Sequence, residues 1–479
     1  MSRTHLLSTL ARLRTVFHPF RHPHTMHNQS MTIETERYRI GGDTFSDHRI
    51  EVPLDRSGKL AGNISVFARE VVRDGQEKAP RLVFFQGGPG SPAPRPAPVG
   101  GWVDWLLNHY RVILFDQRGT GASSPIDSAI VTAQGDSAAQ ADYLACFRAD
   151  AIIDDAEQLR QELQGDKPWH VLGQSFGGFI NTAYLSRAPH GLASVMITAG
   201  LPSVSKHADE TYRLTWASTK ARNEEMFRSF PGLHDRVWDV AVHLENSDER
   251  LVTGERLTPA RLRMLGLVLG YSYGPQTLRF LFEDPFTVIK GEKKLNSRFL
   301  LQVSDRLSFA QNPIYGVLHE SIYSGTAGGP TSWSAHRMRN EFPDHALPGT
   351  EQSPHETEKA AQQAGAQFLF SGEHVFPWQM SDDPSLAPMA EAANLVAERS
   401  FPRLYNTEVL NENTVPASGW VFWDDMFVPA SLSLETAAQI RGFKPFLTND
   451  YHHDGLRADG RKLLERMQSW NMQQRSGHA

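Results

Sequence analysis

The stretch Val171-Leu172-Gly173-Gln174-Ser175-Phe176-Gly177-Gly178 decides the fold of this 479-residue chain. The mostly apolar run 169–172 leads into its Gly-x-Ser-x-Gly turn, and the helix-compatible segment 179–187 follows it. A serine at a sharp turn between a strand and a helix is the context of a nucleophile elbow, where the glycines let the strained backbone approach its neighbours. A chance match is the alternative, because the motif is short. The strand before the turn and the helix after it favour a catalytic role for Ser175.

Apolar runs of strand length recur along the chain around this turn. The run 81–85 has the composition of a parallel strand covered on both faces, and apolar residues at helical spacing in 150–164 predict a helix before the Ser175 strand. The predicted strands are 49–53, 64–68, 81–85, 112–115, 169–172, 195–198, 420–423 and 445–448. The predicted helices are 150–164, 179–187, 210–230, 259–270, 388–398, 432–441 and 460–470. Alternation of strands and helices indicates a mostly parallel α/β sheet.

The character of the sequence changes after Pro202. The following two hundred residues are rich in Arg, Glu, Leu and Trp and contain few β-branched runs. We expect a large helical cap there, inserted into the core, because strands and helices alternate again after it. The predicted division is an N-terminal extension at 1–34, the first part of the core at 35–203, the cap at 204–412 and the second part of the core at 413–479.

Composition restricts the partners and the compartment. Charged residues make up 21% of the chain and the formal net charge is −6, without the basic blocks of nucleic-acid-binding proteins. No apolar run approaches the roughly 18 residues that a membrane helix needs, so we expect neither nucleic acid nor a membrane as partner. One cysteine, Cys146, excludes an internal disulfide and fits a reducing, cytoplasmic location.

Residues 1–34 leave a second location open. Their arginines, serines and leucines, with no acidic residue before Glu34, resemble a mitochondrial transit peptide. The alternatives that we favour are a disordered extension, or a true start at Met26 or Met31. Four histidines in this segment do not predict a metal site, because prolines interrupt them and no carboxylate or thiolate accompanies them.

A serine nucleophile needs a base to take its proton and a carboxylate to hold that base. In a fold with a nucleophile elbow these partners follow the serine in the order acid, histidine, each after a later strand. Asp424 and Asp425 follow the strand 420–423, and His452 and His453 follow the strand 445–448. Spacing alone does not choose between the two aspartates or between the two histidines.

The transition state of acyl transfer also needs donors for its oxyanion. The N–H of Phe176, directly after the serine, is one expected donor. A second should come from the glycine-rich turn Gln86-Gly87-Gly88-Pro89-Gly90 after the strand 81–85, and we assign it to Gly88. This turn lacks the Lys-Ser/Thr of a phosphate loop, so we expect no nucleotide and no other cofactor.

Five motifs together resemble those of the prolyl aminopeptidases, also called proline iminopeptidases, which are serine peptidases of the α/β-hydrolase fold. They are Gln86-Gly87-Gly88-Pro89-Gly90, Asp116-Gln117-Arg118-Gly119-Thr120-Gly121, Gly173-Gln174-Ser175-Phe176-Gly177-Gly178, Asp425-Met426-Phe427-Val428-Pro429 and His453-Asp454-Gly455-Leu456-Arg457. The resemblance is to the longer bacterial form and covers roughly 38–470. It implies Ser175 as nucleophile, Asp425 as triad acid and His453 as base. Gln86 departs from the pattern, since shorter members carry His there.

The resemblance further implies release of an N-terminal proline, whose charged amine acidic cap side chains would bind. Glu320 and Glu373 lie in segments similar to the amine-binding segments of the family, and Glu210 is a weaker third candidate; for each, a solvated surface charge is the alternative. We expect a metal-independent aminopeptidase acting on peptides through an acyl-enzyme. The alternatives are an esterase or a broader aminopeptidase on the same fold, and a non-catalytic small-molecule receptor.

Overall fold

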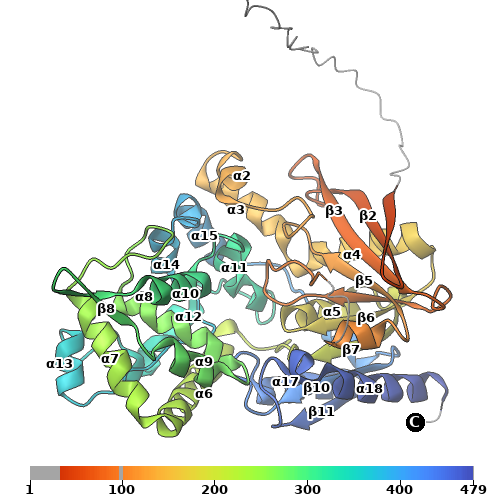
Figure 1. The fold of residues 1–479 in the computed structure, drawn as a ribbon. Coiled ribbons are helices and arrows are strands. Elements are labelled where there is room, and N and C mark those ends of the chain that lie inside the picture. Colours follow the sequence, from red (N-terminus) through yellow and green to blue (C-terminus); the bar gives the residue numbers. More distant parts are fainter. Residues whose placement is uncertain (1–32, 96–100, 478–479) are drawn as a thin grey trace, which may run out of the picture. The chain divides into compact units, whose positions relative to one another are not determined.

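Nine strands form a single sheet within residues 33–95 and 101–477, the part of the chain that the computed structural model describes (Figure 1). In chain order they are β1 (Glu34–Ile40), β2 (Asp43–Pro53), β3 (Asn63–Arg73), β4 (Arg81–Phe85), β5 (Arg111–Asp116), β6 (Trp169–Gln174), β7 (Leu192–Thr198), β10 (Ala417–Phe422) and β11 (Phe443–Thr448). Across the sheet the order is β1-β2-β3-β5-β4-β6-β7-β10-β11. From β5 to β11 every neighbouring pair is parallel, which confirms the predicted mostly parallel sheet.

The first strands of the sheet pair antiparallel, from β1 through β3 to β5. Strand β1 was not predicted, because its residues are mostly polar and exposed and give no apolar alternation. Tyr38 is the residue of β1 that stacks on an apolar neighbour, Phe45 of β2, with ring centroids 5.4 Å apart. Strand β1 therefore forms because it pairs with β2, and its own sequence pattern does not predict it.

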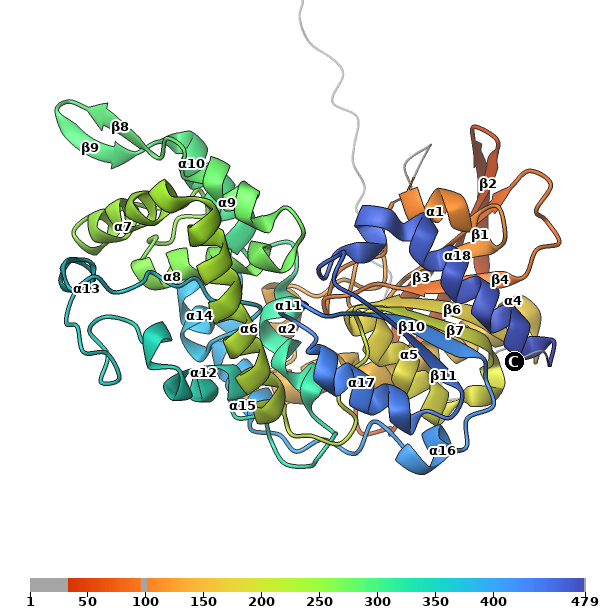
Figure 2. The same ribbon diagram turned by 90° about the horizontal axis from the view of Figure 1, so that it is seen from below.

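Helices cover both faces of the parallel part of the sheet. Helices α1 (Gly101–Leu106) and α18 (Gly455–Arg475) pack together on one face, and α4 (Ala149–Gln164), α5 (Phe176–Arg187) and α17 (Ala430–Gln439) lie on the other (Figure 2). Strands β4, β5 and β6 are consequently buried almost throughout. Their short apolar runs have this composition because neither face of the strand meets water.

Residues 204–412 contribute no strand to the nine-stranded sheet; all of them are described. Their helices are α6 (Ala208–Ser229), α7 (Pro231–Glu245), α8 (Pro259–Arg263), α9 (Gly274–Leu281), α10 (Ser297–Leu307), α11 (Pro313–Leu318), α12 (Ser334–Met338), α13 (Glu358–Gln363), α14 (Pro377–Asp382), α15 (Ala390–Ala397) and α16 (Thr407–Asn411). We call this region the cap. The helix predicted at 259–270 is instead α8 followed by a 3-10 helix, Met264–Gly270, in which Gly266 lies against the Ser371 carbonyl, where a side chain would not fit.

The cap also contains a hairpin that the sequence analysis missed. Strands β8 (Phe286–Ile289) and β9 (Glu292–Leu295) pair antiparallel around the turn Lys290-Gly291. Val288 and Ile289 are exposed. A short two-stranded ribbon of this kind has little periodicity by which it could be recognised.

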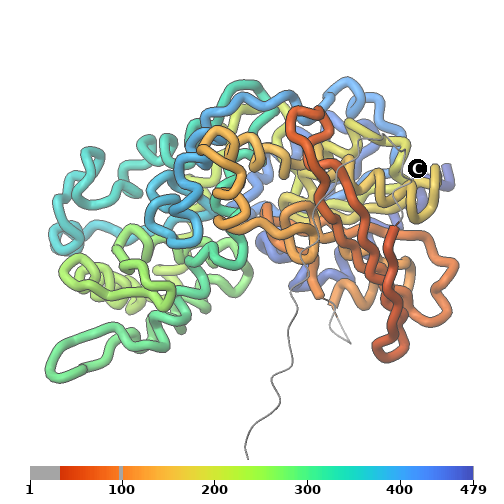
Figure 3. Tube along the Cα trace, turned by 90° about the horizontal axis from the view of Figure 1, so that it is seen from above, coloured from red at the N-terminus to blue at the C-terminus, as the bar shows by residue number. Residues whose placement is uncertain are grey.

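Two helices of the first half of the core contact the cap directly. Helix α3 (Ser137–Leu144) lies beside α15, which follows some 250 residues later, and α2 (Ser128–Thr132) lies beside the short 3-10 helix Ala387–Met389 before α15; Figure 3 shows these orange and blue segments next to each other. The predicted division into core and cap remains an interpretation, since residues 33–479 form one compact unit.

The predicted N-terminal extension lies almost wholly outside the described residues, and its last residue, Glu34, begins β1. Among the helices that the structure describes, none has both the length and the apolar character needed to cross a bilayer.

Candidate active site

Ser175 stands between β6 and α5 in a backbone conformation that only a tight turn imposes. Its φ is 55° and its ψ −126°, and the side chain is buried. Such a conformation is costly for a residue with a side chain and persists because the surroundings hold it. A Cβ on Gly177 would overlap the Phe85 carbonyl, and one on Gly173 would overlap the Gly177 carbonyl. The close approach expected of the two glycines is therefore present at this turn.

An aspartate and a histidine pair at the ends of the neighbouring strands β10 and β11. His453 Nδ1 lies 2.9 Å from Asp425 Oδ2 and 3.1 Å from Asp425 Oδ1. Asp425 Oδ1 also accepts hydrogen bonds from the N–H groups of Phe427 and Val428, at 2.9 and 3.1 Å. Asp424, by contrast, is exposed. The structure thus brings Asp425 together with His453 and leaves Asp424 outside the pair.

The surroundings of His453 favour its charged form. Burial alone would favour the neutral ring, but the charge and hydrogen bond of Asp425 outweigh it and raise the pKa of His453. In the adjacent His452, which is half-buried, burial lowers the pKa. With Nδ1 of His453 occupied by Asp425, Nε2 is the nitrogen left to act on a nucleophile.

The cap and the elbow both hold the loop that carries His453. The N–H of His453 donates to the carbonyl of Gly270 at 3.1 Å, and the Ser272 hydroxyl donates to Asp454 Oδ1 at 2.7 Å. From the elbow, Gln174 Nε2 donates to the His453 carbonyl at 3.5 Å. These contacts place the histidine loop between the sheet edge and the 3-10 helix of the cap.

The glycine-rich turn after β4 lies against the elbow. A Cβ built on Gly87 would be 2.8 Å from Ser175 Cβ, and Gly88 has φ 130°, which side chains rarely permit. Phe176 is the first residue of α5, so its N–H has no carbonyl acceptor within the helix. Asn312 of the cap supports the turn, because its Nδ2 donates to Ser91 Oγ at 3.1 Å.

Glu373 is a partly buried carboxyl of the cap that lies close enough to the Asp–His pair to interact electrostatically with His453. The Tyr315 hydroxyl donates to its Oε1 at 2.7 Å. Burial raises the pKa of Glu373 to about 7, although the nearby His453 acts in the opposite direction. Because a cation stabilises a buried carboxylate, this position suits a positively charged partner.

Glu320 is the second candidate carboxyl of the cap, and it is buried. Its Oε1 accepts from the Ala335 N–H at 2.9 Å, whereas Oε2 has no hydrogen-bond partner among the described residues. Burial raises the pKa of Glu320 to about 7, although backbone donors, with Ala335 first, partly offset this. A buried oxygen without a donor is costly and is satisfied when a donor arrives.

The segment that presents Ala335 to Glu320 is strained. Ser332 and Trp333 have φ of 47° and 56°, which are unusual values for residues with side chains. Consecutive residues of this kind persist only where the surrounding structure holds them.

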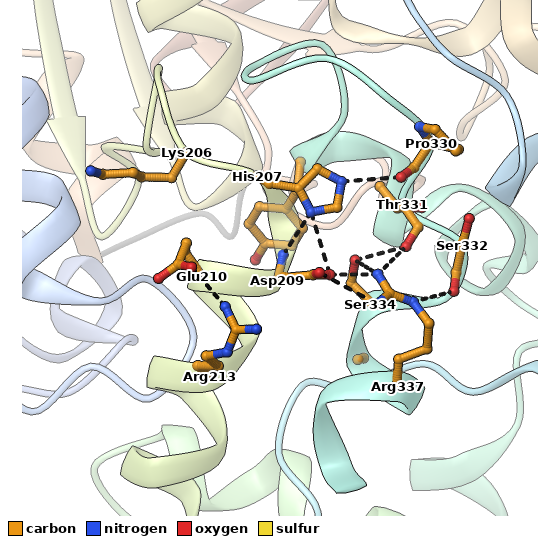
Figure 4. A network of polar contacts seen from close by, with 12 residues as sticks. Lys206, His207, Asp209, Glu210, Arg213, Pro330, Thr331, Ser332, Ser334 and Arg337 are labelled. Carbon is orange, nitrogen blue, oxygen red and sulfur yellow. Dashed lines mark hydrogen bonds and ion pairs between the residues drawn. The ribbon is translucent and has the colours of Figure 1, made fainter. Parts of the chain in front are cut away.

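A polar network holds this strained segment, and Figure 4 shows it from close by. Arg337 of α12 donates to the carbonyls of Thr331 and Ser332, both at 3.0 Å, and pairs with Asp209 of α6 at 2.6 Å. His207, at the start of α6, lies 3.1 Å from the Pro330 carbonyl. Arg337 therefore acts on Glu320 indirectly, through the turn.

Glu210 lies in a different environment from the other two glutamates. Its side chain is 54% exposed and its carboxylate pairs with Arg213 at 2.7 Å (Figure 4). This arrangement is that of a solvated surface charge.

The sequence analysis missed the residues that support the site from the cap. Asn312 could have been recognised as a helix N-cap before Pro313, but nothing in the sequence connects it with the glycine-rich turn. Tyr315 and Arg337 have no sequence signal, because their partners Glu373 and Asp209 are distant in the chain. No cluster of His, Cys, Asp and Glu that could hold a metal ion occurs in the described ranges.

Comparisons with known proteins identify the fold and the family. A family model described as the alpha/beta hydrolase fold matches residues 80–244. A proline iminopeptidase of Aeromonas sobria is 40% identical over 434 residues, which cover 90% of this chain and 97% of that protein. A proline iminopeptidase of Aspergillus aculeatus, aneH, is 31% identical over 431 residues, covering 88% and 92%.

Among solved structures, esterase E22 is 12% identical and covers 89% of this chain and all of its own, at a TM-score of 0.42, which carries no argument about function. The identity and coverage of the two iminopeptidases are sufficient to assign the family. The chain belongs to the proline iminopeptidase family of α/β-hydrolases.

Proposed function

We propose that this protein is a serine aminopeptidase that releases proline from the N-terminus of peptides. The observation that carries the proposal is the His453–Asp425 pair with a cap carboxyl beside it: Glu373 is partly buried, the Tyr315 hydroxyl donates to it at 2.7 Å, and its charge and that of His453 act on each other's pKa. A substrate with a charged amine next to the scissile carbonyl would use both.

In the proposed mechanism His453 takes the proton of Ser175, which attacks the prolyl carbonyl. Asp425 keeps the proton of His453 on Nδ1 and stabilises the imidazolium that forms. The N–H groups of Gly88 and Phe176 stabilise the oxyanion. His453 then protonates the leaving amine, and the acyl-enzyme is hydrolysed by a water molecule that the same histidine activates.

Recognition of the proline amine is assigned to Glu373 and Glu320. Glu320 is buried and Glu373 partly buried, both have pKa values raised to about 7, and an ammonium ion brought next to them favours their ionised forms. The unpaired Oε2 of Glu320 supports this assignment, since a secondary ammonium supplies the missing donor. The cap would close the amine end of the site, which restricts cleavage to the N-terminus.

The test compares prolyl-arylamide, alanyl-arylamide and a simple aryl ester as substrates of the wild type and of Ser175→Ala. We expect a preference for the prolyl substrate and a loss of kcat of at least ~10⁴-fold in the variant. Equal cleavage of the alanyl substrate would indicate a broader aminopeptidase, and cleavage of the ester alone an esterase. Activity that survives in Ser175→Ala would contradict the mechanism.

A further inference from the structure

A cavity of about 230 Å³ lies between the cap and the loop that carries Gly88. Its lining includes Glu373 and Tyr315 from the amine side of the site, Ser91 from the end of the glycine-rich loop, and Arg306 near the end of α10. The cavity therefore adjoins both the carboxyl to which we assign the substrate amine and the loop to which we assign the oxyanion.

The cavity carries one acid and one permanent cation. Glu373 is the acidic residue of its lining and Arg306 the basic one. His374 also lines it, but burial lowers the pKa of this histidine well below its usual value, so its ring is neutral. The other side chains are apolar or uncharged, with Met264, Leu267, Leu307, Phe309 and Val375 among them. The space thus presents a carboxyl and a guanidinium against a weakly polar background.

The guanidinium of Arg306 has N–H donors that are not used within the described part of the chain. Its Nη1 donates to the carbonyl of Gln302 on its own helix, at 2.7 Å. Within the described part of the chain, no carboxylate oxygen lies within 4.0 Å of its guanidinium. A guanidinium has five N–H donors in a planar fork that matches the two oxygens of a carboxylate. A half-buried arginine without an acidic partner, on the wall of a cavity next to the site, can therefore accept an anion.

We propose that Arg306 binds the C-terminal carboxylate of short substrates and so makes the enzyme selective for dipeptides and tripeptides that end in a free carboxylate. This inference rests on the proposed function, which puts the substrate amine at Glu373 and the scissile carbonyl at Ser175. The residues after proline then pass Ser91 and enter the cavity. An extended dipeptide spans at most ~7 Å and a tripeptide ~11 Å, so only short chains bring their carboxylate to a group on the wall of the same cavity.

The experiment compares Pro-Gly with Pro-Gly-amide, which differ only in the terminal charge, on the wild type, Arg306→Gln and Arg306→Lys. The readout is the ratio of kcat/KM for the dipeptide to kcat/KM for its amide. Taking this ratio within each variant and comparing variants cancels the difference in leaving-group chemistry between the two substrates. We expect Arg306→Gln to lower the ratio about 10-fold, and Arg306→Lys to lower it less, because lysine keeps the charge but not the fork.

The matched control is Arg298→Gln, which removes an exposed arginine from the same helix, away from the cavity lining. Its ratio should equal that of the wild type. The inference is overturned if Arg306→Gln leaves the ratio unchanged, or if Arg298→Gln lowers it equally, since a general effect of net charge would then explain the result.

Prolyl-arylamide, which has no carboxylate, distinguishes a failure of the carboxylate site from a failure of the proposed function. If the wild type cleaves it and the ratio is insensitive to Arg306, the carboxylate site is wrong and the proposed function stands. If the wild type cleaves neither the arylamide nor either peptide, the proposed function is wrong and the carboxylate site is overturned with it.

Discussion

Ser175, Asp425 and His453 stand at the ends of strands β6, β10 and β11, whereas Glu320 and Glu373 stand in the cap, each held by one direct contact. The strand ends are fixed by the parallel ladders of the sheet. Glu373 is held by the Tyr315 hydroxyl and Glu320 by the Ala335 N–H. The group that we assign to the chemistry is therefore built on the sheet, whereas the group that we assign to recognition depends on the packing of the cap, through one tyrosine hydroxyl at Glu373 and one backbone N–H at Glu320.

The two groups also differ in their electrostatics. Asp425 has His453 and two backbone N–H groups as partners. For Glu320 and Glu373 burial disfavours the ionised form and raises both pKa values to about 7. Recognition should therefore respond to pH near neutrality and to the charge of the substrate. Catalysis by Ser175, Asp425 and His453 should instead depend on whether the strand ends keep these side chains in position.

The largest effect is expected at the triad acid. Asp425→Asn should lower kcat for prolyl-arylamide by ~10³- to 10⁴-fold, because an amide cannot hold His453 in the required tautomer. Asp424→Asn, the adjacent and exposed position, is the control and should change kcat less than 2-fold. Steady-state kinetics of the two variants decide between the aspartates. Similar losses in both would show that the Asp425–His453 pair is not the catalytic one.

The pH dependence distinguishes the cap from the triad. A cap carboxyl with a pKa of about 7 binds an ammonium only when ionised, so kcat/KM for prolyl-arylamide should fall as pH drops through 7, by ~100-fold down to pH 5 for one such group. Protonation of His453 acts in the same direction. For an aryl ester without an amine, the acid limb of kcat/KM should reflect only the ionisation of His453. The assignment of the cap carboxyls fails if both substrates give the same acid limb.

A smaller effect is expected when Glu373 loses its hydrogen-bond donor. Tyr315→Phe removes the hydroxyl that stabilises the carboxylate, so the pKa of Glu373 should rise further and kcat/KM for prolyl-arylamide should fall about 10-fold at pH 7. The fall should shrink as the pH is raised to 9. Tyr273→Phe, at an exposed tyrosine of the cap, is the control. A loss that is independent of pH would indicate damaged packing instead.

Arg337 supports the turn that holds Glu320 and does not bind the substrate itself, so the effect of its substitution on kinetics should be smaller still. Arg337→Gln should raise KM for prolyl-arylamide about 3-fold with little change in kcat, because the strained turn that holds Glu320 loosens. Arg213→Gln removes a comparable arginine that pairs with Glu210 and Glu341 at the surface and should leave KM unchanged. Equal effects of the two variants would show that the network is only a surface ion-pair cluster.

The smallest expected difference concerns stability in acid. Burial lowers the pKa of His319 and His345 in the cap to about 3, and that of His374 well below its usual value. These rings stay neutral in the folded state while the unfolded chain binds protons below pH 6.5, so stability is lost as pH falls from 6.5 toward 3. Glu320 and Glu373 act in the opposite direction between pH 7 and 4.5, but by smaller shifts.

Hydrogen exchange at pH 7 and pH 4.5 checks this expectation. Amides of the cap should lose protection before those of strands β4 to β7, and the midpoint of thermal unfolding should fall by several degrees. One such histidine, His170 with a pKa lowered to about 4 by burial, lies in β6, but the three above lie in the cap, so earlier loss in the sheet would contradict the expectation.

The sequence predicted an element correctly where the local pattern of residues reflects the surroundings of that element in the fold. Strands β4 to β7 are short apolar runs because both of their faces are covered, and the elbow is recognisable because its glycines meet backbone atoms. Strand β1, the β8–β9 hairpin and the break after α8 escaped prediction, since pairing and local contacts, not periodicity, produce them. Spacing left Asp424 and Asp425 equivalent; burial of one and exposure of the other distinguishes them.

The supporting residues of the cap could not be predicted for a related reason. Tyr315 reaches Glu373 across 58 positions and Arg337 reaches Asp209 across 128, and no local rule links such pairs. The resemblance to a family supplied Glu320 and Glu373. Their burial, their raised pKa values and the different ways in which they are held come from the tertiary structure alone.

The central claim is that the cap recognises the amine while the sheet edge performs the chemistry, and one measurement tests it directly. Aryl esters of proline and of cyclopentanecarboxylic acid have the same ring size and differ by the ring nitrogen. The ratio of kcat/KM for the two esters should favour proline in the wild type and fall about 100-fold in Glu373→Gln, because the charge pair between the carboxylate and the proline amine is lost. A ratio that is the same in the wild type and in Glu373→Gln would contradict the account.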